Sequence, residues 1–164
     1  MIRVSALLFF TFAGAEANAL SCKPPNLAQN FNQYQESDKS YQLFVGKVEM
    51  EDPTPKYIEG RARHAKGIAH GRFIEERSLT QVLSVNITVK SICAGSWCGK
   101  FPSQNQNNDW VIFLEKTSKG DLLTIGPCHQ THGQHITKDQ INVLQKCLRQ
   151  GKCSDGDIKL LQMQ

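Results

Sequence analysis

The sequence predicts a mainly β domain: a small antiparallel barrel of about five strands, closed by a C-terminal α-helix and stapled by disulfide bonds. Three observations lead to this prediction. Short apolar and β-branched runs, separated by turn-forming residues, recur along the chain. An amphipathic segment with helix start and stop signals follows them at 137–151. The six cysteines are even in number and follow an N-terminal export signal, which is typical of an exported, disulfide-bonded domain.

The N-terminus has the three parts of a secretory signal peptide. Arg3 provides a positive charge, residues 4–14 are apolar, and Ala17-Asn18-Ala19 supplies the small-x-small pattern that signal peptidase cleaves. The apolar run is shorter than the about 20 residues that a transmembrane helix needs, and no second such run follows. We therefore expect residues 1–19 to be a signal peptide. Residues 20–164 are then one domain, secreted or periplasmic, with no membrane span after cleavage.

The charge of the chain is mildly positive. It contains 19 Lys and Arg against 15 Asp and Glu, a formal net charge of +4, and loss of residues 1–19 removes one charge of each sign. Nucleic-acid-binding domains usually carry a clustered basic stripe. The nearest approach to one is Arg61, Arg63, His64 and Lys66, which we expect on a solvated loop. The composition therefore argues against a nucleic-acid partner.

All six cysteines belong to the predicted mature domain: Cys22, Cys93, Cys98, Cys128, Cys147 and Cys153. Cys93 and Cys98 flank a short turn-forming segment, so we expect them to clip a loop. Cys147 ends the predicted helix and Cys153 follows it closely, so this pair is expected to staple the helix end. Cys22 and Cys128 then remain, and a bond between them would tie the N-terminus to the end of the last strand.

The first part of the mature chain is predicted to be extended, followed by a strand. Residues 23–40 are polar, although Phe31 and Tyr34 are spaced for one face of a short helical turn. Residues 41–50 form a strand with Leu43, Val45 and Val48 facing inward. Gly46 interrupts the strand, which indicates a bulge or a close backbone approach. Asp52-Pro53-Thr54-Pro55 ends it.

The middle of the chain supplies the other strands. Residues 56–71 are basic and contain glycine, so we expect a loop or irregular hairpin, with a short strand at 72–76. Residues 82–92 give the clearest strand signal, because apolar Val85, Ile87 and Val89 alternate with Asn86, Thr88 and Lys90. A loop at 99–108 precedes strands at 110–114 and 122–125, which a turn at 116–121 connects.

A helix is predicted to close the domain. Thr137 is the candidate N-cap, and Gln140 stands three residues later, as a capping box requires. The apolar side chains of the segment share one face, and Gly151 ends it. That face consists of Ile141, Leu144, Cys147 and Leu148.

A set of short motifs occurs in order over residues 22–128. They are Cys22-Lys-Pro-Pro, Phe31, residues 43–48 (LFVGKV), residues 85–90 (VNITVK), Cys98-Gly99, residues 109–114 (DWVIFL) and Cys128. In these motifs the chain resembles the netrin-type module, the OB-fold-like barrel of tissue inhibitors of metalloproteinases and of complement and netrin C-terminal domains. The segment 93–99 with Gly126-Pro127-Cys128 also resembles small exported bacterial proteins of no assigned activity.

The resemblance implies a protein partner, in its sharpest form a metalloproteinase. In the inhibitors the mature chain begins with a cysteine whose α-amine and carbonyl chelate the zinc of the target. Here cleavage after Ala19 leaves Leu20-Ser21 ahead of Cys22, and Pro24 replaces the second cysteine of the inhibitors' Cys-x-Cys start. A cut after Ser21 would expose Cys22, which makes this cysteine a candidate binding residue.

Three histidines form a second candidate site. His129, His132 and His135 follow Cys128 in a segment that Gly133 marks as a loop. Imidazoles at this spacing could hold zinc or copper, and a solvated polar loop is the alternative. No other cofactor is expected.

Catalytic signatures are missing. Paired cysteines leave no thiolate nucleophile, the spacing of Cys93 and Cys98 is not that of thiol oxidoreductases, and neither a nucleophile elbow nor a phosphate loop is present. Trp110 starts an apolar strand and is expected in the core, whereas Trp97 either anchors a partner or covers the disulfide. We therefore expect an exported binding module with an unidentified protein partner, a metal-binding protein as the alternative, and not an enzyme.

Overall fold

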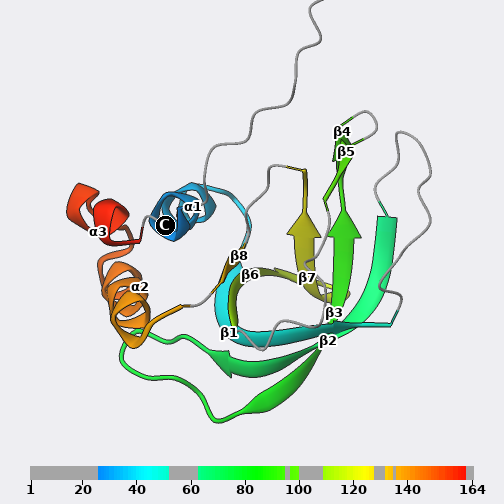
Figure 1. The fold of residues 1–164 in the computed structure, drawn as a ribbon, viewed down its shortest axis with the longest axis horizontal. Coiled ribbons are helices and arrows are strands. Elements are labelled where there is room, and N and C mark those ends of the chain that lie inside the picture. Colours follow the sequence, from blue (N-terminus) through cyan, green and yellow to red (C-terminus); the bar gives the residue numbers. More distant parts are fainter. Residues whose placement is uncertain are drawn as a thin grey trace, which may run out of the picture.

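A computed structural model describes residues 26–51, 63–94, 97–99, 109–127, 132–134 and 136–161, with only the backbone described at 132–134. Figure 1 shows a β-barrel with a layer of helices packed against one side. The elements in chain order are α1 (Leu27–Gln35), β1 (Tyr41–Met50), β2 (Arg63–Phe73), β3 (Leu83–Ser91), β4 (Cys93–Ala94), β5 (Trp97–Cys98), β6 (Trp110–Thr117), β7 (Gly120–Ile125), β8 (His132–Gln134), α2 (Lys138–Gln150) and α3 (Asp155–Leu160).

The predicted barrel is confirmed: five strands close in the order β1-β2-β3-β7-β6, and β6 pairs back with β1. Four of the five pairings are antiparallel, whereas β3 and β7 run parallel. The predicted antiparallel arrangement thus holds for four of the five pairings, and the β3–β7 pairing is the exception. The reason is geometric, because an odd number of strands in a closed ring cannot alternate in direction at every neighbour.

The barrel wall separates two apolar cores. The interior is filled by Phe44, Val48, Ala69, Ile87, Val89, Trp110, Ile112, Leu114, Leu123 and Ile125. The outer core lies between one side of the wall and the helices, and consists of Leu27, Ala28, Phe31, Leu43, Val45, Ile74, Val111, Phe113, Leu144, Cys147, Cys153 and Leu161. β1 and β6 contribute successive side chains to opposite cores, which explains why their apolar runs show little alternation.

The strand predictions hold for most of the barrel. β1 has the predicted bounds, β3 lies within 82–92, and Ile87 and Val89 are buried in the interior. Trp110 is core, with 5% of its surface exposed. β6 and β7 extend beyond the predicted strands, so the turn between them shrinks to Ser118 and Lys119.

β2 is the main correction within the barrel. Residues 63–71, expected in a loop or irregular hairpin, form most of an 11-residue strand, and the strand expected at 72–76 ends at Phe73. Between Arg63 and Phe73, the positions of β2 that face the interior are small, as at Ala65 and Ala69, so no apolar alternation was visible. Glycine is needed at Gly71 of this face because β1 and β2 approach closely there: a Cβ on Gly71 would lie 2.1 Å from the carbonyl oxygen of Val45, and a Cβ on Gly46 would lie 2.1 Å from that of His70. This close approach was one of the two explanations of Gly46 drawn from the sequence.

The helical layer is larger than predicted. Residues 27–35, expected to be extended apart from a short helical turn at Phe31 and Tyr34, form α1. Its first amides, at Ala28 and Gln29, donate to the side chain of Asn26. The extended prediction failed because polar residues cover the exposed side of a helix whose other side packs Phe31 into the outer core. α3 was also not foreseen. α2 was predicted correctly, with its capping box at Thr137 and the left-handed Gly151 after its last turn.

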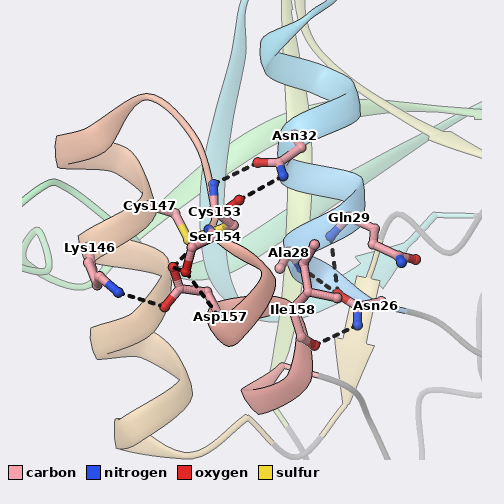
Figure 2. The surroundings of a disulfide bond; sticks show 10 residues. All are labelled: Asn26, Ala28, Gln29, Asn32, Lys146, Cys147, Cys153, Ser154, Asp157 and Ile158. Atoms are coloured by element: carbon pink, nitrogen blue, oxygen red, sulfur yellow. Dashed lines mark hydrogen bonds and ion pairs between the residues drawn. A yellow bond between two sulfur atoms is a disulfide. The ribbon is translucent and has the colours of Figure 1, made fainter.

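Hydrogen bonds fasten the three helices to one another (Figure 2). Asn26 Nδ2 donates to the carbonyl of Ile158 in α3 at 2.8 Å. Lys146 of α2 donates to Asp157 of α3 at 2.9 Å. The Cys147–Cys153 disulfide joins the last turn of α2 to the segment that leads into α3. The N-terminal and C-terminal parts of the described chain thus form one layer against the barrel.

Candidate functional site

The β4–β5 hairpin (residues 93–98) is the candidate contact site that the structure describes best. It follows β3 and projects from one end of the barrel in Figure 1. Ala94 pairs with Trp97, and the disulfide between Cys93 and Cys98 closes the hairpin beside this pair. The large apolar side chain of Trp97 is 60% exposed. The sequence left two interpretations of Trp97 open, an anchor for a partner and a cover for the disulfide.

The base of this hairpin is firmly held. Ser91 Oγ donates to the carbonyl of Gly99 at 2.8 Å in a buried hydrogen bond. The amide of Gly99 donates to Ile92 O at 3.0 Å, and the amide of Ile92 donates to Ile125 O at 2.7 Å. β3, the hairpin and the end of β7 are therefore tied together. An exposed aromatic on such a support loses little conformational entropy when it binds a partner.

The predicted disulfides fall into two groups. The Cys93–Cys98 and Cys147–Cys153 bonds are both present, as the spacing of these cysteines indicated. Cys22 and Cys128 lie outside the described residues, and so does the predicted signal peptide at 1–19. No cysteine in the described part of the chain is free, so that part offers no thiolate nucleophile.

The histidine site stays a prediction. His129 and His135 lie outside the described residues. The backbone of His132 belongs to the short strand β8, which pairs with β6 and lies in a segment expected to be a loop. Among the residues that the structure describes, no group of three or more His, Cys, Asp or Glu side chains is placed to hold a metal ion.

The basic residues near position 63 do not lie on a loop. Arg63, His64 and Lys66 belong to β2, whereas Arg61 lies outside the described residues. Strand alternation separates them: His64 and Lys66 point outward and are exposed, and Arg63 lies on the interior face of β2. The correction follows from the strand itself, since a strand splits a basic cluster between its two faces.

A polar row on the outside of the barrel was not predicted from the sequence. Ser84 of β3 is paired in register with His70 of β2, and Ser84 Oγ lies 2.8 Å from His70 Nδ1. His70 Nε2 lies 3.7 Å from a carboxylate oxygen of Glu49 in β1. Serine, imidazole and carboxylate thus follow one another as in a hydrolase triad. The side chains of His70 and Glu49 are 40% and 70% exposed, so water screens the row and it lacks the water-excluded setting of a catalytic site.

No sequence signal could have located this row. Its three residues stand in three different strands, and only the register of β1, β2 and β3 brings them together. The structure therefore supports surface hydrogen bonding here rather than catalysis.

Comparison of the chain with family models, with curated proteins and with solved structures found no match. In the described residues no helix is long and apolar enough to span a membrane.

Proposed function

We propose that this chain is an exported binding module that contacts a protein partner through the β4–β5 hairpin, with Trp97 as the anchor. We base this proposal on the 60% exposure of Trp97 on a disulfide-closed hairpin that projects from the barrel. Tryptophan is enriched among the residues that dominate binding energy in protein interfaces. An aromatic with no place in either core is therefore better explained by a partner than by folding.

The rigid support of Trp97 favours a preorganised interface. The hairpin base is hydrogen-bonded to the ends of β3 and β7, so its position is set by the barrel. The disulfides support an oxidising compartment, in agreement with the predicted export signal. A protease-inhibitor-like function, which the netrin-type resemblance of the sequence implies, is the sharper version of this proposal.

A site-specific crosslink tests the hairpin as the contact site. A photoreactive phenylalanine analogue replaces Trp97 in the exported protein, and Val82, an exposed residue directly before β3, carries the same probe as the matched control (67% exposed). We expect a discrete crosslinked species from position 97 only. Trp97→Ala should abolish co-purification of the same partner, whereas Val82→Ala should retain it. Equal crosslinking at both positions, or none at position 97, would contradict the proposal.

The mature N-terminus tests the inhibitor version separately. A mass that begins at Cys22, together with inhibition of a zinc protease, would support it. A mass that begins at Leu20 would exclude chelation by the α-amine of Cys22 and leave the binding function of the hairpin unaffected.

A further inference from the structure

Arg63 lies inside one end of the barrel. It is the first residue of β2, and it pairs in register with Ser91 of β3, whose side chain is buried. Side chains of a strand alternate between its faces, so Arg63 shares the face of Ala65 and Ala69, and Ala69 is part of the barrel interior. β2 begins at the end of the barrel from which the β4–β5 hairpin projects (Figure 1).

One edge of the Arg63 guanidinium has no partner among the residues that the structure describes. Its Nε and Nη2 atoms are buried, and neither makes a hydrogen bond in the described part of the chain. These two nitrogens form the edge of the planar group that donates two parallel hydrogen bonds to a carboxylate or a phosphate. A buried charged donor without an acceptor is unfavourable. An oxyanion bound at this position would supply the missing acceptor.

The described polar groups around this end of the barrel already form hydrogen bonds with one another. The carbonyls of Ile92, Gly99 and Ile125 each accept a hydrogen bond from a neighbouring group of the hairpin base. The ion pairs among the described residues lie elsewhere, as the Lys116–Asp121 pair does. None of them includes Arg63.

Two lysines of the outer face, Lys66 and Lys90, lie near Arg63. His64 pairs in register with Lys90 in the row next to Arg63 and Ser91. Lys66 follows on the same outer face as His64 and is exposed. The nearest described acid by backbone pairing is exposed Glu51, whose amide donates to Lys66 O. This charge distribution attracts an anion to the end of the barrel.

We propose that the Nε–Nη2 edge of Arg63 binds an oxyanion, either a carboxylate or a phosphate or sulfate group, at this end of the barrel. The anion is a free small ion or the anionic group of a larger ligand, such as a peptide carboxylate. This site is independent of the proposed role of Trp97, since it uses the interior of the barrel rather than the hairpin surface.

Arginine-selective NMR of the wild-type protein tests the proposal. The Nε–Hε signals are followed during titration with inorganic phosphate, sulfate, acetate and N-acetyl-glycyl-glycine, with sodium chloride keeping the ionic strength constant. We expect a saturable shift of the Arg63 signal with at least one oxyanion, and none for exposed Arg72 on the outer face of the same strand. Stronger binding of the peptide than of acetate would identify the carboxylate of a larger ligand, and the reverse order would identify a free ion.

Two results would overturn the proposal. One is the absence of a saturable Arg63 shift with all four probes. The other is an Arg63 Hε that is already hydrogen-bonded to a carboxylate of the chain itself and does not respond to any probe. Both are read from wild-type protein, so they do not depend on the folding of a variant.

Substitutions provide the second measurement. Arg63→Lys keeps the charge but loses the two-pronged edge, and we expect it to bind the effective probe about tenfold more weakly. Arg63→Gln should abolish binding. Arg72→Lys and Arg72→Gln are the matched controls and should leave the affinity unchanged. Equal affinities of wild type and Arg63→Gln would contradict the assignment of the site to Arg63.

Discussion

The side-chain amide of Asn32 forms two hydrogen bonds with the backbone of Cys153, 121 residues away. Asn32 Nδ2 donates to the carbonyl of Cys153 at 3.0 Å, and the amide of Cys153 donates to Asn32 Oδ1 at 2.7 Å. Figure 2 shows this pair between α1 and the segment before α3. It joins the two ends of the described chain at the residue that also carries the Cys147 disulfide.

Asn32→Asp should destabilise the fold by about 2 kcal/mol. The carboxylate still accepts from the Cys153 amide, but it cannot donate to the Cys153 carbonyl, so two oxygens face each other in a partly buried site. Urea unfolding followed by circular dichroism measures the change. Asn142→Asp, on the exposed side of α2, is the control and should shift stability by less than about 0.5 kcal/mol.

Asp157 should make stability depend on acid pH. Hydrogen bonds from Ser154 and from Lys146 lower the pKa of this buried carboxyl from 3.8 to about 2. Because the folded pKa is depressed, the stabilisation is fully present above the unfolded pKa and is lost as pH falls from about 4 to about 2. We expect a loss of about 2 kcal/mol across that window in the wild type.

The control for this titration is a pair of asparagine variants. Asp157→Asn should remove the stabilisation and flatten the pH dependence between about pH 4 and pH 2. Asp155→Asn, exposed in the same helix, should retain the wild-type profile. Parallel profiles for wild type and Asp157→Asn would show that the carboxyl does not contribute.

Gly46→Ala should be among the most damaging single changes in the barrel. A Cβ there would lie 2.1 Å from His70 O and 2.7 Å from the Cα of Gly71. Both are backbone atoms, so the strands must separate, at a cost of about 3 kcal/mol or more. Gly156→Ala is the matched control, since its Cβ would meet only Ser154 Oγ at 3.7 Å. Thermal unfolding of both variants checks the prediction, and equal midpoints would contradict it.

The two described disulfides should differ in resistance to reduction. Cys147 and Cys153 are buried in the outer core, whereas Cys93 and Cys98 lie on the hairpin and are partly exposed. A reductant therefore reaches the hairpin bond first. Limited reduction followed by alkylation and peptide mass analysis should label Cys93 and Cys98 before Cys147 and Cys153. The difference should vanish in urea, where both bonds are accessible.

Several elements were predictable because their signals are local. The alternation at 82–92 marks β3, and the capping box of Thr137 with Gln140 marks the start of α2. The short spacing within the pairs Cys93–Cys98 and Cys147–Cys153 indicated both disulfides. These features depend on a few neighbouring residues, so they can be recognised in the sequence.

The missed elements depend on distant partners. β2 shows no apolar alternation because its inward positions between Arg63 and Phe73 are small, and Gly71 is glycine because β1 comes close at Gly46. The sequence of α1 resembles a polar extended segment, because Leu27 and Phe31 pack into an outer core that α2 forms in part. Neither requirement can be seen without the packing partner.

By itself the sequence determined the class of fold, most strand positions, the cap of α2 and the two local disulfides. Only the tertiary structure decided that β3 and β7 run parallel, that Trp97 stands exposed on a supported hairpin, and that Arg63 points into the end of the barrel with one edge unpaired. The physical reason is the separation along the chain of the residues that set each feature. Caps, alternation and short loops are set by neighbours along the chain, whereas exposure and hydrogen-bond satisfaction are set by the closure of the barrel, which brings distant residues together.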